Sequence, residues 1–288
     1  MNSKFTNWGL FILLSFIWGS SFILMKEGLK ELTAYQVAAI RMLSAGIVLL
    51  PFAVKGFRTV ERKSLKYIIL TGLIGSFIPA ILFCIAQTKI DSALAGMLNA
   101  LTPLFVIVVG VLFFKSKTHW QKILGVIIGF GGMILLFLSQ KNDGQNNHWF
   151  YAFLILLATI CYGLNVNILN RYLKHISSIQ IAAIAFVSLI VPSLILLVAD
   201  EFFNHSFTVS VLKATGAGAL LGIFGTAIAS ILFYMLMKRA GALFASMVTY
   251  GVPFVAVFWG VMAGESVTTL QILGLLIILS GVYLANKQ

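Results

Sequence analysis

Long apolar runs alternate with short polar connections along the whole chain. Ten runs are each about 20 residues long, which is enough for a helix to cross the hydrocarbon core of a bilayer. The runs are continuously apolar and do not alternate with polar residues, which excludes a transmembrane β-barrel. The pattern therefore predicts an all-α integral membrane protein with ten transmembrane helices, at about residues 8–25, 35–54, 66–86, 91–114, 120–138, 149–169, 177–198, 213–236, 241–262 and 268–285.

The second half of the chain repeats the first. Residues 72–115 align without a gap onto residues 222–265, and glycines, a phenylalanine and a proline recur at the same spacing. The earlier parts match at an offset of 144, which places Trp18 on Tyr162. Each copy thus holds five spans, and an odd number of spans turns the second copy upside down in the membrane. We predict two inverted five-helix repeats, residues 1–143 and 144–288.

Inverted repeats are the architecture of secondary transporters, with the substrate site near the midplane between the copies. One sequence folded in both orientations supplies two nearly equivalent conformations, each open to one side. The alternative is an ancient duplication kept only for packing. Transport is favoured, because enzymes and structural proteins have little use for the inversion.

Composition and charge agree with a membrane protein. The chain is 60% hydrophobic and 10% charged, with a net charge of +12. Fourteen Lys and Arg residues fall in the segments on one side of the predicted membrane and five on the other, whereas seven of the eight acidic residues fall on the second side. Lys and Arg concentrate in cytoplasmic loops. We therefore expect both termini in the cytoplasm of a bacterial cell, a multi-pass location in the cell membrane, and no binding of nucleic acid.

Short motifs occur in order along the two copies. They are Trp18-Gly19-Ser20-Ser21-Phe22 in the first span, Arg41 followed by Ala45, Pro103 and Pro253 in the fourth and ninth spans, and Gly264-Glu265 after the ninth. Over nearly the whole chain these motifs resemble the EamA-like ten-helix exporters of the drug/metabolite transporter superfamily. The resemblance implies a central cavity lined by the first, third, fourth, sixth, eighth and ninth spans. Lys115 departs from the family pattern, because it stands in the first copy at the position that Glu265 occupies in the second.

Polar and aromatic residues inside the spans occur in pairs related by the repeat, at helical spacings of three or four. We predict that their faces converge on a substrate-binding cavity, although Ser, Thr and Asn can also serve only as packing contacts between helices. The predicted substrate-binding residues are Trp18, Phe22, Arg41, Ser76, Phe83, Asn99, Tyr162, Asn165, Thr226, Tyr234, Thr249 and Tyr250. Pro103 and Pro253 are expected to kink their helices, because each removes a helix hydrogen bond.

Arg41 is the one charged side chain well inside a predicted span. A structural interpretation has it extend outward or pair with Glu27 or Glu31. A functional interpretation has it capture a substrate carboxylate. Its repeat partner is the apolar Ala185, so the symmetry does not support the functional interpretation, and the structural one is favoured.

Several signals are missing from the sequence. No Asp or Glu lies in the middle of a span, the four histidines fall in loops, and no G-x-x-x-x-G-K motif occurs. We expect no cofactor and no metal, and facilitated diffusion or exchange in preference to ATP driving, with proton coupling through Glu265 or through a titrating substrate left open. The expected partners are a small-molecule substrate and membrane lipid. The chain is expected as a monomer or as a homodimer, the latter through glycines such as Gly125-x-x-x-Gly129.

The favoured function is an exporter of small amphipathic metabolites, amino acids foremost. A flippase for a lipid-linked substrate is an alternative within transport. An integral membrane enzyme would need His, Cys, Asp or Glu converging at one interface, and here those residues are scattered over loops and, for Cys84 and Cys161, over two different spans.

Leucine in place of Asn99 or Tyr162 tests the predicted cavity. Each substitution removes a polar group from the expected lining, so transport by the variant is expected to fall while the protein still folds. Uptake into proteoliposomes, beside a melting curve of the purified variant, measures both. Normal transport by well-folded variants would exclude these two residues from the site.

Overall fold

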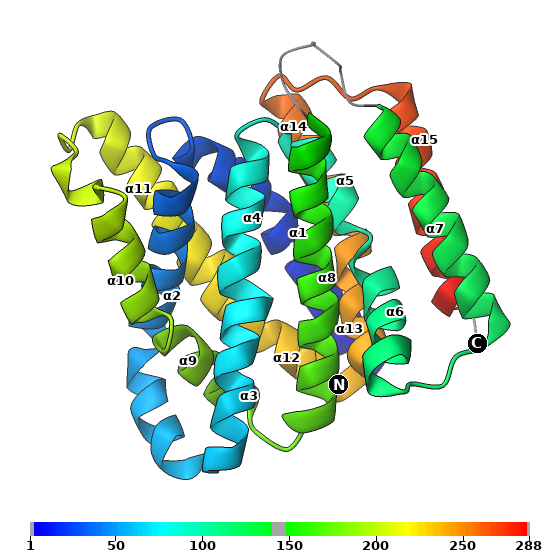
Figure 1. The fold of residues 1–288 in the computed structure, drawn as a ribbon, viewed down its shortest axis with the longest axis horizontal. Coiled ribbons are helices and arrows are strands. Elements are labelled where there is room, and N and C mark those ends of the chain that lie inside the picture. Colours follow the sequence, from blue (N-terminus) through cyan, green and yellow to red (C-terminus); the bar gives the residue numbers. More distant parts are fainter. Residues whose placement is uncertain (1–2, 140–147, 287–288) are drawn as a thin grey trace.

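The chain is described by a computed structural model over residues 3–139 and 148–286, and in these ranges it forms helices without strands. Figure 1 shows the helices standing side by side in one bundle. The first five spans are α1 (Ser3–Gly28), α2 (Ala34–Thr59), α3 (Arg62–Gly72) continued by the π-helix η1 (Leu73–Phe77) and α4 (Ile78–Gln87), α5 (Ser92–Asn99) with α6 (Thr102–Phe114), and α7 (Trp120–Leu138).

The second five spans follow the same order. They are α8 (His148–Tyr172), α9 (Ser178–Val187) with α10 (Ile190–Ala199), α11 (Val209–Gly222) continued by the π-helix η3 (Ile223–Ile228) and α12 (Ala229–Ala240), α13 (Ala242–Ser246) with η4 (Met247–Tyr250) and α14 (Val252–Met262), and α15 (Thr269–Asn286). A short 3-10 turn, η2 (Phe202–Asn204), lies between α10 and α11.

The ten predicted spans are confirmed in the described residues. Nine helical segments are long and apolar enough to cross a membrane, and a tenth apolar helix, Thr269–Ala285, is slightly shorter. Several spans extend beyond their apolar runs, and the eighth covers Val209–Ala240. It begins early because the Thr208 side chain accepts a hydrogen bond from the Val211 amide, which caps the helix. Large apolar side chains such as Ile127 and Phe254 are exposed and would meet lipid.

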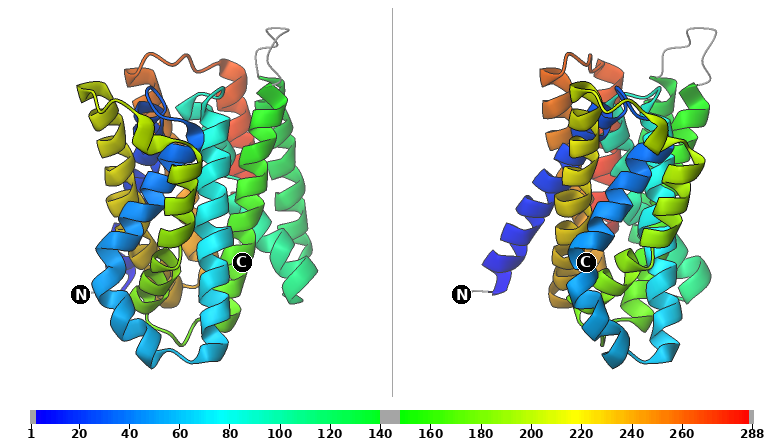
Figure 2. Two further views of the ribbon diagram at one scale, coloured as in Figure 1. Left: turned by 60° about the vertical axis from the view of Figure 1, so that its left-hand side comes forward. Right: turned by 90° about the vertical axis from the view of Figure 1, so that its left-hand side faces the viewer.

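The two halves run in opposite directions along the bundle. Figure 1 shows α1 starting near the lower end and α8 starting at the upper end, and the side views of Figure 2 agree. The predicted boundary between residues 143 and 144 lies outside the described residues. We call the end at which α1 begins the basic end and the end at which α8 begins the acidic end.

The helices pack in pairs that the repeat relates to one another. The second spans contact each other through α2 and α9–α10, and the fifth spans through α7 and α15. The first span of each half packs against the other half: α1 against α11, α12 and α14, and α8 against α3, α4 and α6. A two-fold axis between the halves produces this reciprocal arrangement. It also means that the centre of the bundle is built from both halves.

The fifth spans, α7 and α15, approach each other closely along glycines. A side chain at Gly132 would come within 2.6 Å of the backbone oxygen of Gly274, and one at Gly125 would overlap the backbone of Gly281. Small residues allow two helix backbones this close, which is how membrane helices gain van der Waals contact. The Gly125 face is therefore occupied within the chain by α15, and Gly129 packs on Leu104 of α6.

Alanine at Gly132 and at the adjacent Gly131 is a matched pair that tests this contact. Gly132→Ala places a methyl group against the backbone of α15, so we expect the melting temperature to fall by several degrees. Gly131→Ala meets nothing within 4 Å, and alanine favours a helix over glycine by about 1 kcal/mol, so its melting temperature should hold or rise. Equal effects of the two substitutions would contradict the close packing of α7 and α15.

Candidate functional site

A cavity lies at the centre of the bundle, between the first, second, third and fourth spans of one half and the sixth, eighth and ninth of the other. About 110 Å³ of it admits the centre of a water molecule. Its wall includes eleven of the twelve predicted residues, and Tyr250 is not among them. The predicted residues in the wall are Trp18, Phe22, Arg41, Ser76, Phe83, Asn99, Tyr162, Asn165, Thr226, Tyr234 and Thr249. Their role in substrate binding stays a prediction.

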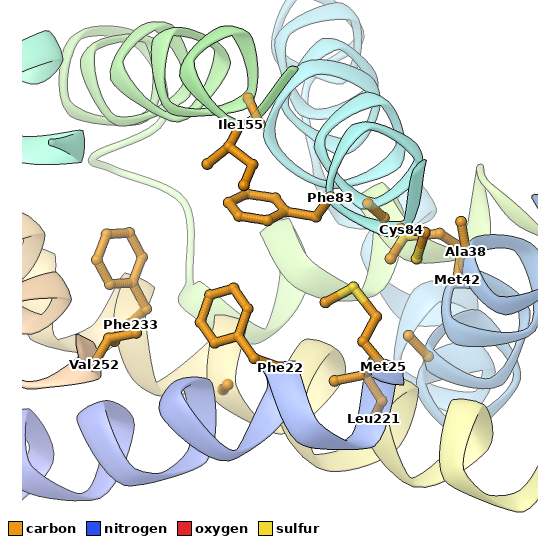
Figure 3. Close-up of a cluster of buried hydrophobic side chains, with 14 of the residues drawn as sticks. Phe22, Met25, Ala38, Met42, Phe83, Cys84, Ile155, Leu221, Phe233 and Val252 are labelled. Atoms are coloured by element: carbon orange, nitrogen blue, oxygen red, sulfur yellow. The ribbon is translucent and has the colours of Figure 1, made fainter. Parts of the chain in front are cut away.

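Aromatic rings form much of the wall, in pairs related by the repeat. The ring centroids of Trp18 and Phe233 are 5.2 Å apart, and those of the equivalent Tyr162 and Phe83 are 6.1 Å apart. Phe22 meets Phe83 at 5.7 Å in an edge-on contact. Figure 3 shows Phe22, Phe83 and Phe233 extending from different helices into the same space. The Trp18–Phe233 and Tyr162–Phe83 pairs each join the first span of one half to the third span of the other, whereas Phe22 and Phe83 belong to the same half.

Two π-helical turns bring backbone to the cavity, at equivalent places in the third and eighth spans. In each turn a glycine lies beneath a polar side chain from the first span of the other half: Asn165 rests on Gly75, and Ser21 on Gly225. A β-carbon at either glycine would overlap that side chain. The indole Nε1 of Trp18 donates to the Gly225 carbonyl at 3.0 Å. Such π-turns within α-helices are frequent at functional sites.

Arg41 points into the bundle and not toward the acidic side chains at the end of α1. Its Nε donates to Thr226 Oγ1 at 2.7 Å, whereas Glu27 pairs with Lys30 at 2.7 Å. The pairing with Glu27 or Glu31 considered from the sequence is therefore not found in the described residues, and the side-chain partner of Arg41 is Thr226. The reason is the register of α2, which turns position 41 toward η3 and not toward the loop. Arg41 is the one charged side chain among the lining residues described.

The fourth and ninth spans are broken where they pass the cavity. Pro103 and Pro253 are each the second residue of the helix that follows the break, where a missing amide hydrogen removes no helix bond. The Asn99 carbonyl ahead of the first break accepts a hydrogen bond from Thr102 Oγ1 at 2.8 Å, and the Ser246 carbonyl accepts one from Thr249 at 2.8 Å. These two hydroxyls bond to carbonyls of their own spans, so the bonds are not the contacts between helices that the packing alternative expects.

The prediction left out some wall residues, among them Met25, Gly75, Gly225 and Ser246. The two glycines carried a usable signal, because they are identical in both copies at an offset of 150. Met25 and Ser246 are not repeated as identical residues in the other copy, so no pattern in the sequence selects them. No group of three or more His, Cys, Asp or Glu side chains that could hold a metal ion occurs in the described residues.

A second hollow opens at the basic end. About 370 Å³ of it admits the centre of a water molecule. It lies between the end of α6 with the loop that follows, the last turns of α8, and the start of α13. Lys117, Lys122 and Asn170 are among the residues that line it.

A model of the EamA-like transporter family matches the chain twice, over residues 7–138 and 149–287. The chain belongs to the EamA-like transporter family. The resemblance noted in the sequence motifs is thereby confirmed. As a member of this family, the chain is a multi-pass membrane protein that transports a small molecule.

Relatives of this EamA-like chain carry transporter names. It is 27% identical over 287 residues to the inner membrane transporter YedA of Escherichia coli strain K12, covering 96% of the chain and 90% of the relative. It is 27% identical over 272 residues to the S-adenosylmethionine/S-adenosylhomocysteine transporter of Chlamydia trachomatis, covering 89% and 82%. A solved crystal structure shares the fold with a TM-score of 0.66 at 15% identity, covering 98% of this chain and 96% of the other.

Proposed function

We propose that this transporter exports small amphipathic zwitterions, amino acids foremost, by alternating access through the central cavity. The observation that carries the proposal is the Arg41 guanidinium, a positive charge in a wall that is otherwise aromatic, aliphatic and neutral polar among the described residues. A substrate that brings its own carboxylate would neutralise that charge where little water is present to screen it.

The donor inventory of Arg41 supports this substrate group. A guanidinium has five N–H donors, and the Thr226 hydroxyl occupies the one on Nε. The two terminal nitrogens form the fork that binds a carboxylate with two parallel hydrogen bonds. The structural partner Thr226 therefore holds the guanidinium in place without using that fork.

Other residues of the cavity wall support an ammonium group. The Oδ1 of Asn165 is buried and has no hydrogen-bond partner within the described residues, although a buried acceptor normally has one. An amide oxygen and the faces of Trp18 and Tyr162 attract a cation without adding a fixed charge. The aromatic rings that remain would pack against an apolar side chain of the substrate.

The name of one relative agrees with this substrate class. S-adenosylmethionine, which appears in the name of the Chlamydia trachomatis relative, carries a carboxylate and an ammonium on one carbon, as amino acids do. For export, the basic end faces the cytoplasm, because Lys and Arg concentrate on that side of membrane proteins. Both chain termini then lie in the cytoplasm.

Thermal unfolding of the purified protein tests the carboxylate contact. A ligand at 100 times its dissociation constant stabilises the folded state by about 2.7 kcal/mol. We expect L-phenylalanine or S-adenosylmethionine to raise the melting temperature, and 2-phenylethylamine, which lacks the carboxylate, to raise it much less. In Arg41→Gln the affinity for the amino acid should fall about ten- to a hundredfold, the usual worth of hydrogen bonds to a charged group.

Arg58→Gln is the matched control, because Arg58 is exposed on the same helix, α2, at the basic end. It should bind the amino acid as the unaltered protein does. Equal stabilisation by the amine and the amino acid, or an unchanged response in Arg41→Gln, would exclude capture of a carboxylate by Arg41. Counterflow of the bound solute in proteoliposomes then tests alternating access.

A further inference from the structure

Glu265 is buried at the acidic end, where it joins three elements. Its side chain is 2% exposed, and Oε1 lies 2.6 Å from the Lys26 ammonium of α1. The backbone amides of Ser92 and Ala93, at the start of α5, donate to its two oxygens at 3.0 and 2.9 Å. A carboxylate at the beginning of a helix is favoured by the free amide groups there. Glu265 therefore fastens the loop after α14 to both α1 and α5.

Neighbouring contacts extend this attachment across the acidic end. Gln87, at the end of α4, donates to the Phe22 carbonyl of α1 at 3.2 Å and to the Ser92 hydroxyl at 3.1 Å. The Trp259 indole of α14 donates to the Ser20 hydroxyl of α1 at 2.8 Å. The first, third, fourth and ninth spans are thus linked on the acidic side of the cavity.

The basic end has the same framework without the carboxylate. After α14 the chain turns at Gly264, with φ +83°, and Glu265 follows; after α6 it turns at Lys115, with φ +54°, and Ser116 follows. A β-carbon at Gly260 would meet Glu265 Oε2, and one at the equivalent Gly110 would meet Ser116 Oγ at 3.3 Å. Structurally, Ser116 takes the place of Glu265, one residue later than the ungapped alignment indicates.

The other members of the framework are separated at the basic end. By the repeat, Lys26 corresponds to Asn170, and Ser92 and Ala93 correspond to Ala242 and Leu243. These three counterparts line the open hollow of about 370 Å³. The same set of positions is therefore fastened at one end of the bundle and borders an open hollow at the other, where Arg171 of α8 still donates to the Phe114 carbonyl of α6 at 3.0 Å.

We propose that Glu265, Lys26 and the start of α5 form a latch that holds the acidic end closed, so that the conformation open at the basic end is the resting state. Transport then requires this latch to open. In that step α5 would move away from α14 and give the acidic end the open arrangement that α13 and α6 have at the basic end. The proposal rests on the proposed alternating access.

The charge state of Glu265 agrees with a latch that is shut at neutral pH. Burial opposes ionisation, but the hydrogen bonds from Lys26 and from the amides of Ala93 and Ser92 outweigh it and lower the pKa of Glu265 below 4.5. Lys26 is the charged group that contacts the carboxylate, and Asp91 precedes the amides at the start of α5. A lowered pKa means that the contact is complete at neutral pH and is lost only as the pH falls below the ordinary pKa of a glutamate.

Spin-label distance measurements test the latch without substrate. Labels on cysteines introduced at Thr88 and Met262, both exposed, report the separation of the α4–α5 turn from the end of α14. The background carries alanine at Cys84 and Cys161, and the protein is held in lipid nanodiscs. Glu265→Gln and Lys26→Met should each raise the ratio of long to short distances about ten- to a hundredfold, because each removes a charge-assisted hydrogen bond.

Glu27→Gln is the matched control. Glu27 also forms a 2.7 Å ion pair at the acidic end, with Lys30, but that pair is exposed, so its loss should leave the distances unchanged. The unaltered protein should show one short distance at neutral pH and approach the Glu265→Gln result only in acid, as the carboxylate becomes protonated. Unchanged distances in both latch variants, or an equal shift in Glu27→Gln, would overturn the proposal. Since no ligand is used, the outcome does not depend on the proposed substrate class.

Discussion

Backbone hydrogen bonds inside a bilayer cannot be completed by water, and this constraint decides where the chain departs from straight helices. The π-turns η1 and η3 and the breaks in the fourth and ninth spans all border the central cavity. Groups released there have partners from the protein: the Gly225 carbonyl accepts from the Trp18 indole, and the Asn99 carbonyl accepts from Thr102. The irregular backbone and the cavity therefore occur together, because the side chains that surround the cavity supply hydrogen-bond partners for the released backbone groups.

The distribution of charge follows from the same constraint. In the described chain, acidic side chains lie toward the ends of the spans, where Glu265 alone is buried and has both an ammonium and two amides for partners. Arg41 is the exception in the centre, and one hydroxyl satisfies only part of its donor set. A charge kept partly unpaired among aromatic rings is costly to a membrane helix. This cost is the strongest indication that a bound solute supplies the remaining hydrogen-bond acceptors for Arg41.

Hydropathy alone predicts the ten spans, and matching the two copies selects most of the cavity wall from an otherwise uninformative apolar sequence. Hydropathy succeeds because a span must be apolar over the thickness of the bilayer. Matching the copies succeeds because equivalent residues of an inverted repeat lie around the same central cavity. Orientation around a helix axis is harder to predict. The partner of Arg41 depends on the rotation of α2 against η3. The π-turns insert one residue into the helical period, and although Pro79 follows η1 at the start of α4, no proline follows η3 in α12. The sequence alignment places Lys115 on Glu265, but the structure places Ser116 there. The difference of one residue arises because α6 ends later than its repeat counterpart α14.

The two glycine contacts have a consequence for how this chain can change. Gly75 lies under Asn165 and Gly225 under Ser21, so each half accommodates a side chain that belongs to the other. A larger residue at position 21 or 165 has no room unless the opposite π-turn changes with it. Substitutions on the two sides of these contacts must therefore arise together, and neither five-helix half could drift in sequence, or adapt its share of the cavity to a new solute, independently of its partner.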